Sequence, residues 1–412
     1  MPPCLFSLSY NKKKVNVYNA QIYLLFFVLL LNKFTAVLSF AYDIEDNFIK
    51  ELSKYVAEWR LLFMEKKQTG GIYFAAMNTG EGFKSYFTEV FGDLDRLYII
   101  KGGPGTGKSR FMKDVNAEAE SRGFVTEKYL CSSDPTSLDG IVIPALSLGI
   151  IDGTAPHAYE PFLSGAKDNI IDLGRFWSVA ALKKEISVIE EISKRKARLY
   201  RGIYDYLKAV KCYDNIIGDT VKEALDLPKF NHVVKKTAFA LGSGENNEKK
   251  IKIRSAISDQ GVITLNSFAK FAKKRFCILD TCGVGGHFLS ALLKETSKNG
   301  LSSFVSYDPF SPSLPDAIYY PSSDTSFYIG SETDFEEAYI NTRRFINDVT
   351  LRPYKPKIRA ISRLKKDALK EMFTDFASVK RLHSELESIY GRAMDFDAKE
   401  SFSNKFIPSL FE

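Results

Sequence analysis

The sequence predicts an α/β protein made of two similar halves, each a parallel sheet flanked by helices and followed by a helical appendage. Three observations lead to this prediction. Short apolar runs alternate with helical patterns, a glycine-rich loop follows one of the runs, and a weaker copy of the same order returns after residue 250. Such alternation is typical of parallel sheets covered on both faces. The 412 residues, 45% of them hydrophobic, are enough for two ordinary domains.

The first 63 residues stand apart from the two halves. An apolar run at 22–31 is broken by Asn32 and Lys33. A bilayer span needs about 20 apolar residues, so membrane contact would require the whole segment 22–40 to be retained as an anchor. Three interpretations of residues 1–63 stay open: a leader or over-extended start before Met64, a membrane anchor, and a cleaved signal peptide.

The most informative segment joins a buried strand to a glycine-rich loop. Gly102, four residues and then Gly107, Lys108 and Ser109 fit the Walker A pattern in full. Glycines let backbone N–H groups curl around phosphate oxygens, and the following helix points its positive end at them. Lys108 is expected to reach the β and γ oxygens, and the Ser109 hydroxyl to ligate Mg²⁺. The expected nucleotide-binding residues are Gly102, Gly103, Pro104, Gly105, Thr106, Gly107, Lys108, Ser109 and Arg110.

Strand, loop and helix in this order predict a P-loop NTPase sheet, with ATP and Mg²⁺ as cofactors. Magnesium chemistry also needs a carboxylate at the end of a neighbouring strand. The apolar run 145–151 ends at Asp152, which is the expected metal-side acid, and a turn aspartate is the alternative. Asp134 and Asp139 follow a second predicted strand, 124–130, and either could act as a base or simply form a turn. Lys108, Asp134 and Asp152 are therefore the candidate catalytic residues.

These motifs occur in one order along the chain. Asn78 to Phe83, the loop 102–109, segments 131–140 and 152–157, and the C-terminal run 385–396 follow one another. In this order they resemble a largely uncharacterised bacterial family of tandem P-loop ATPase-like proteins, over about residues 64–396. The resemblance implies ATP binding and two P-loop-type halves, and it implies no particular substrate.

The second half carries a degenerate copy of the loop. Residues 276–288 repeat the strand and loop, with His287 in the lysine position and Phe288 in the serine position, and Ile329 replaces the acid. A neutral imidazole does not supply the lysine charge, and phenylalanine offers no oxygen to a metal. We therefore expect only the first half to bind nucleotide.

Each half is expected to end in amphipathic helices. Apolar residues recur at three- and four-residue steps in 177–221 and again in 361–389. These helices could form a lid or a partner-docking arm, or could pack against their own domain. The predicted domains are 64–240, with the intact loop, a linker at 241–250, and a degenerate P-loop-like domain at 251–412.

The sequence leaves the reaction open. The leading hypothesis is binding and hydrolysis of Mg-ATP in the first half. The alternatives are an ATP-dependent small-molecule or nucleotide kinase, and a non-catalytic nucleotide-gated module that binds a protein partner through its helices. The net charge of +7 is mixed along the chain, so no nucleic-acid partner is expected. Five scattered cysteines indicate no disulfide framework, and a cytoplasmic location is expected.

Overall fold

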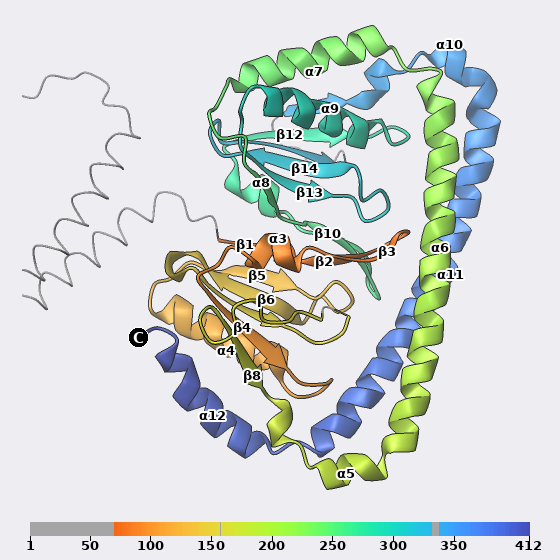
Figure 1. Cartoon of the computed structure of the whole chain (residues 1–412). Helices are drawn as coiled ribbons and strands as arrows, with labels where there is room; N and C mark the ends of the chain where they lie inside the picture. The colour runs from red at the N-terminus through yellow and green to blue at the C-terminus, as the bar shows by residue number, and fades with distance from the viewer. Residues whose placement is uncertain (1–69, 157, 332–337) are drawn as a thin grey trace, which may run out of the picture. The chain divides into compact units, whose positions relative to one another are not determined.

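The computed structural model describes residues 70–156, 158–331 and 338–412 (Figure 1). The chain divides into two compact units, and all of these residues belong to the second, Gln68–Glu412. The expectations for residues 1–63, including membrane contact through 22–40, lie outside the described residues. Within the described ranges, no helix combines the length and the apolarity that crossing a bilayer requires.

Two six-stranded sheets form the centres of the two halves (Figure 1). In spatial order, the strands of the first sheet are β1 (Gly71–Phe74), β5 (Glu127–Leu130), β6 (Leu138–Ile143), β7 (Leu148–Asp152), β4 (Arg96–Lys101) and β8 (Asp168–Asp172). Those of the second sheet are β9 (Lys249–Ile251), β13 (Ser303–Tyr307), β14 (Pro315–Tyr320), β15 (Thr325–Gly330), β12 (Lys274–Leu279) and β16 (Ala338–Asn341). Strand directions agree at every position, which confirms that one α/β arrangement is duplicated.

Both sheets are mixed, so the prediction of a purely parallel sheet is wrong. β6 and β14 run antiparallel to both of their neighbours. The segments 131–137 and 144–147 join β6 to its neighbours, whereas a parallel crossover needs a dozen residues or more. The chain therefore reverses direction at each of these short links. The strands nearest the glycine-rich loop, β7, β4 and β8, are parallel as predicted.

Two strands begin later than their apolar runs suggest. β5 starts at Glu127 and β7 at Leu148. Pro144–Leu146 instead forms the 3₁₀ helix η1, and Ser147 takes a positive φ of 47°. Proline favours such a turn because its φ is already restricted. Part of the expected linker is likewise ordered as a strand, because β9 pairs with β13.

A short hairpin precedes the glycine-rich loop in each half. The hairpin strands are β2 (Ala76–Thr79) with β3 (Gly82–Ser85), and β10 (Ser255–Ser258) with β11 (Gly261–Thr264). The Thr79 hydroxyl donates a hydrogen bond to the carbonyl of Gly82 at 2.8 Å, and the Ser258 hydroxyl donates to that of Gly261 at 3.3 Å. Both glycines have positive φ, 104° and 97°. The same turn is therefore built twice, which supports the internal repeat at the level of single residues.

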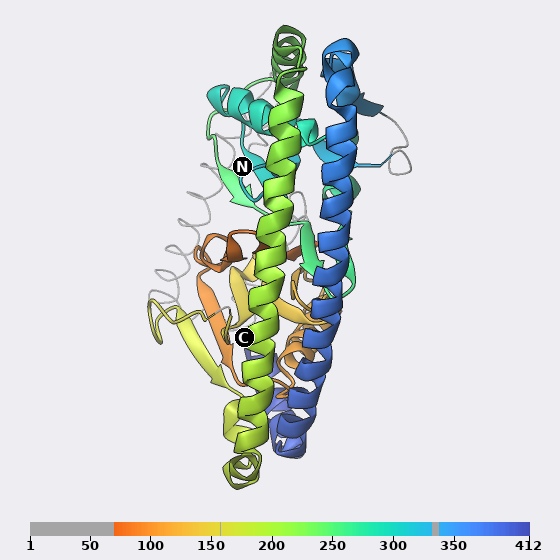
Figure 2. The same cartoon turned by 90° about the vertical axis from the view of Figure 1, so that its right-hand side faces the viewer.

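The long helices of the two appendages form an antiparallel pair. α6 (Ile186–Lys222) and α11 (Lys355–Arg392) lie side by side in both Figure 1 and Figure 2. Each has one apolar stripe, and the stripes meet in a core that includes Leu207 and Phe376. The amphipathic helices are confirmed, and their apolar stripes pack on each other.

The other helices of the described chain are shorter. They are α3 (Phe87–Phe91), α4 (Lys108–Ser121), η2 (Gly174–Phe176), α5 (Val179–Lys184), α7 (Leu227–Leu241), α8 (Ser267–Phe271), α9 (Val284–Lys298), η3 (Thr342–Phe345), α10 (Asp348–Leu351), η4 (Arg352–Tyr354) and α12 (Phe396–Ser409).

The two halves exchange their last helices. α7, which ends the first appendage, packs on α9 of the second half, where Phe230 lies against Phe288. α12, which ends the second appendage, packs on α4 of the first half, where Ile407 joins the core that contains Phe111. The C-terminal helix thus lies beside the glycine-rich loop, far from it in sequence.

Matching hydrogen bonds show which residues correspond in the two appendages. The N–H of Asp395 donates to the carbonyl of Phe176 at 2.9 Å, and the N–H of Asp226 donates to that of Phe345 at 2.8 Å. Both aspartates also cap the helix that follows them. Asp395 therefore corresponds to Asp226, and residues at equal distances along α12 and α7 correspond to each other.

Candidate functional site

The glycine-rich loop lies at the carboxyl end of β4 and leads directly into α4. Gly105 and Gly107 have φ values of 71° and 79°, a region in which residues with a side chain are strained. The buried Thr106 hydroxyl donates to the carbonyl of Gly103 at 2.9 Å and ties the loop to itself. The loop is therefore curled as anion binding requires, with the N-terminus of α4 at its end.

Lys108 folds back across the loop. Its Nζ donates to the carbonyl oxygens of Gly102 and Gly103, both at 2.8 Å, and lies 3.5 Å from Oδ2 of Asp152. The Lys108 and Asp152 side chains are only 12% and 14% exposed. Two of the three candidate catalytic residues thus meet, because parallel pairing of β4 with β7 sets Ile100 beside Asp152.

Asp152 lies in a polar corner with a second carboxylate. Its Oδ1 accepts hydrogen bonds from the backbone N–H and the hydroxyl of Thr154, at 2.9 and 2.5 Å. Burial raises the pKa of Asp152, Lys108 and Thr154 oppose the rise, and the nearby Asp139 charge adds to it. The Ser109 hydroxyl, the other expected metal ligand, accepts from the N–H of Leu138, the residue before Asp139.

The donor atoms in this corner suit magnesium. Asp152 and Asp139 offer carboxylate oxygens, and Ser109 offers a hydroxyl. Mg²⁺ prefers oxygen ligands and usually binds through one or two carboxylates together with water and substrate phosphates. In the part of the chain that the structure describes, no group of three or more His, Cys, Asp or Glu side chains is arranged to hold a metal ion.

Asp134 points to the long helix pair. Its Oδ2 lies 2.7 Å from Nζ of Lys380 on α11, and its Oδ1 accepts from the Thr136 hydroxyl at 2.8 Å. Burial alone would raise the pKa of Asp134, but hydrogen bonds from Lys380 and Thr136 hold it below its ordinary value. A carboxylate with a lowered pKa is a weak base. The contacts of Asp134 therefore favour a link between sheet and helix over proton transfer.

α11 passes directly over the loop. A Cβ atom built on Gly105 would lie 2.5 Å from the carbonyl oxygen of Glu387, and one on Gly103 would lie 3.2 Å from the Trp177 ring and 3.5 Å from that of Tyr390. Only glycine permits this approach at Gly105. The C-terminal segment that supported the family resemblance thus packs on the glycine-rich loop of the other half.

Ionisable residues of α11 and α6 gather next to the loop. Nδ1 of His383 lies 2.9 Å from Nζ of Lys196, and its Nε2 lies 3.6 Å from Oε1 of Glu387. Burial lowers the pKa of His383 to about 4, with help from Lys196 and Lys380, so its imidazole is neutral at pH 7. Burial raises the pKa of Glu387, while Lys380 and Lys108 oppose the rise.

Sequence reasoning gave these α11 residues no role. On a predicted amphipathic helix, charged residues between apolar positions look like an ordinary solvated face. Their proximity to the loop depends on how two helices of 37 and 38 residues pair, and local sequence does not encode that pairing.

The loop of the second half is shorter than the sequence comparison indicates. α9 begins directly after Gly283, whose φ of 81° matches the 79° of Gly107. The connection from strand to helix therefore spans 280–283, against 102–107 in the first half. A connection two residues shorter leaves less backbone to curl around an anion.

Val284, the first residue of α9, stands where Lys108 stands in α4. The predicted placement of His287 and Phe288 at the lysine and serine positions is therefore wrong. Because both loops are rich in glycine, their sequences align without a gap. That alignment does not reveal that the second loop is two residues shorter. The second half still lacks a lysine at this position, with valine in its place.

In the second half, charged side chains lie at the positions that match the glycine-rich loop and Asp139 of the first half. The Asp280 carboxylate accepts hydrogen bonds from the N–H groups of Gly283 and Gly285, at 2.9 and 2.5 Å, at the N-terminus of α9. Nε of the buried Arg254 lies 3.1 Å from Oδ2 of Asp316, which matches Asp139 as the second residue of its strand. The Asp280 carboxylate therefore lies at the helix N-terminus of this half, and the Arg254 guanidinium pairs with the aspartate that matches Asp139.

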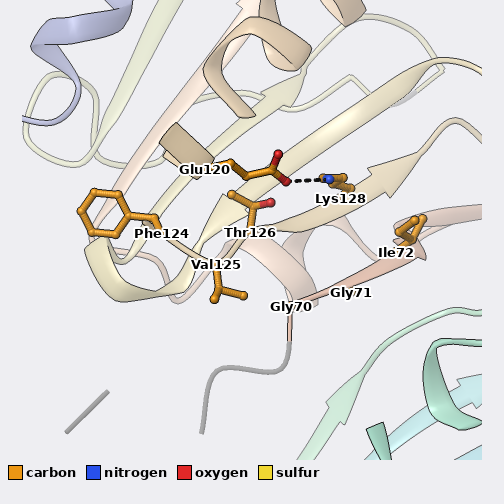
Figure 3. Close-up of a pocket in the computed structure, with 8 residues that line it drawn as sticks. All are labelled: Gly70, Gly71, Ile72, Glu120, Phe124, Val125, Thr126 and Lys128. Atoms are coloured by element: carbon orange, nitrogen blue, oxygen red, sulfur yellow. Dashed lines mark hydrogen bonds and ion pairs between the residues drawn. The ribbon is translucent and has the colours of Figure 1, made fainter. Parts of the chain in front are cut away.

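A surface pocket lies away from the loop. It is lined by Gly70, Gly71, Ile72, Glu120, Phe124, Val125, Thr126 and Lys128 (Figure 3). These residues lie at the starts of β1 and β5 and near the end of α4, whereas the loop lies at the carboxyl end of the parallel strands. Across the pocket, Glu120 and Lys128 form an ion pair at 2.9 Å. Its position assigns it no part in the candidate site.

A scan against protein-family models, a search of curated proteins and a search of solved structures found no match to this chain.

Proposed function

We propose that this chain is a P-loop nucleotide-binding protein that binds Mg-ATP through residues 102–110 of its first half. One observation carries the proposal: Nζ of Lys108 contacts the carbonyls of Gly102 and Gly103 and lies near Asp152, within a loop that curls into the N-terminus of α4. An ammonium held by neutral carbonyls gains by moving to phosphate oxygens, because charge-assisted hydrogen bonds are stronger. The order of motifs, which resembles tandem P-loop ATPase-like proteins, adds support.

Magnesium has suitable ligands in this half. Ser109 and Asp152 would hold it, with Asp139 next to them. When bound, Mg²⁺ neutralises charge on the β and γ phosphates. In the second half, Arg254 already neutralises the matching aspartate and Asp280 already caps the matching helix. This contrast supports a single nucleotide site per chain.

We further propose that the bound ATP is hydrolysed. The backbone carbonyl of Glu387 lies over the loop, and the charge of Lys108 acts on its carboxylate. The raised pKa of Glu387 makes that carboxylate a better proton acceptor than an ordinary surface glutamate. A water molecule would transfer a proton to Glu387 as its oxygen attacks the terminal phosphorus, and ADP would leave. The kinase alternative has less support, because it relied on Asp134 as the base and Lys380 pairs with that carboxylate.

The test is calorimetric binding of Mg-ATP to the full chain. Wild type and Lys128→Ala, a surface control that also removes one positive charge, should bind, and Lys108→Ala should not. Equal binding by Lys108→Ala, or no binding by wild type, would overturn the proposal.

Phosphate release distinguishes the reactions. Release that depends on Lys108 supports the ATPase. Binding without release, with phosphate transferred to an added small molecule or nucleotide, would establish the kinase instead. Binding with neither release nor transfer would leave a nucleotide-gated module, for which ATP-dependent capture of a partner is the further measurement.

A further inference from the structure

A buried lysine from the C-terminal helix faces the Walker A loop. Lys399, on the first turn of α12, is 6% exposed. A Cβ atom built on Gly107 would lie 3.6 Å from its Cε and 3.7 Å from its Nζ. Within the described residues, Nζ of Lys399 has no hydrogen bond or ion pair. The side chain of Lys399 is therefore packed next to the loop, with its ammonium available to an anion.

The electrostatic surroundings of Lys399 call for an anion. Gly107 caps α4, so the positive end of that helix lies beside the lysine. Arg110 adds a further positive charge and already engages the nearby acid, Asp114, at 2.8 Å. Burial lowers the pKa of Lys399, Asp114 and Glu400 oppose this, and Arg110 adds to it. Lys399 and Arg110 thus add positive charge at the N-terminus of α4, where an anionic ligand would be attracted.

The second half provides an internal comparison. Lys399 is four residues after Asp395, and its counterpart four residues after Asp226 is Phe230. Phe230 packs on the Phe288 and Phe345 rings, with centroids 5.9 and 5.4 Å away. The half whose loop has lost its lysine has therefore also lost the lysine of the exchanged helix. Two lysines that are kept or lost together point to one shared ligand.

We propose that Lys399 binds a phosphate oxygen of the nucleotide held by the Walker A loop, so that the nucleotide joins the C-terminal helix to the first half. This inference rests on the proposed function and adds to it a residue and a coupled element. The ligand class is a nucleoside di- or triphosphate. Its phosphates would lie between Lys399 and the N-terminus of α4, and α12 would be held down while nucleotide is bound.

The experiment compares Lys399→Met, Lys399→Arg and Lys405→Met in the full chain. Lys405 is exposed on the same helix and serves as the matched control. Binding of Mg-ATP and Mg-ADP is measured by calorimetry. We expect Lys399→Met to bind at least one of them about 10-fold or more weakly, as loss of a charged hydrogen bond predicts. Lys399→Arg should stay within about threefold of wild type because it keeps the charge, and Lys405→Met should be unchanged.

Melting without nucleotide separates binding from structure. Methionine keeps the unbranched apolar stem of the lysine side chain, so ligand-free Lys399→Met should melt no earlier than wild type. Earlier melting would show a structural role and overturn the inference. Amide exchange in α12 should slow when Mg-ATP binds wild type and should not slow in Lys399→Met.

The failures of the two proposals are distinguishable. If wild type binds, Lys108→Ala does not, and Lys399→Met binds as wild type does, only the role of Lys399 is overturned. If wild type does not bind nucleotide, both proposals fall.

Discussion

Nζ of Lys108 lies 3.5 Å from Oδ2 of Asp152, across the ends of two neighbouring parallel strands. The first residue comes from the helix after β4 and the second from the last position of β7. Each side chain is largely buried, so their attraction is less screened than that of a surface pair. This pairing places a cation and an acid together where the loop would hold phosphates.

Replacing Asp152 with asparagine should weaken magnesium-dependent binding. The variant loses a carboxylate ligand while keeping shape and the acceptor for Thr154. We expect ATP affinity to fall about 10-fold in Mg²⁺, as for the loss of one charged contact, and to change little in EDTA. Calorimetry under both conditions measures this, with the exposed Asp172→Asn as control. An equal loss with and without metal would contradict a metal-side role.

Replacing Glu387 with glutamine should slow hydrolysis without weakening binding. Loss of a general base typically costs about 10²- to 10⁴-fold in rate. The measurement is single-turnover phosphate release at saturating ATP, together with binding by calorimetry. Glu385→Gln, exposed on the same helix, is the control. If turnover persists in Glu387→Gln at the wild-type rate, the proton acceptor is another group.

Acid should destabilise the protein through His383. Its pKa is about 4 when folded, against an ordinary value of 6.5. Between these values, the unfolded imidazole takes up a proton and the folded one does not, so stability falls as pH drops from about 6.5 to 4. We expect a contribution of about 1 kcal/mol, reduced by solvent screening because the side chain is 34% exposed.

Urea unfolding at pH 7 and pH 5 measures the effect of His383. His383→Gln should lose less stability between these two values than wild type does. The exposed His232 on α7 provides the matched His232→Gln control. Equal pH dependence in wild type and His383→Gln would show that other groups dominate in this range.

The second half should contribute stability and no second nucleotide site. We expect one Mg-ATP per chain by calorimetry. Asp280→Ala should leave that affinity unchanged and destabilise folding by about 1 kcal/mol, because it removes the acceptor for two N–H groups at the start of α9. Two equivalents of nucleotide per chain, or weaker binding by Asp280→Ala, would contradict this assignment.

Sequence by itself determined the local parts of this protein. Gly105, Gly107 and Lys108 follow one another along the chain, so pattern and spacing predict the curled loop and the helix after it. The apolar stripes of the long helices are likewise a local, periodic property. The duplication also left a direct trace, including the hairpin turns at Thr79 and Ser258.

Tertiary structure alone decided what surrounds the loop. Strand direction depends on link lengths that apolar runs do not define, so the mixed sheets and the late start of β7 were not predicted. The match between Val284 and Lys108 became evident only from the residue at which α9 begins, because the glycines align equally well with or without a gap. Glu387 and Lys399 reach the loop only because two long helices pair and the halves exchange their last helices. Contacts between residues this far apart in sequence arise from packing, which local patterns do not record.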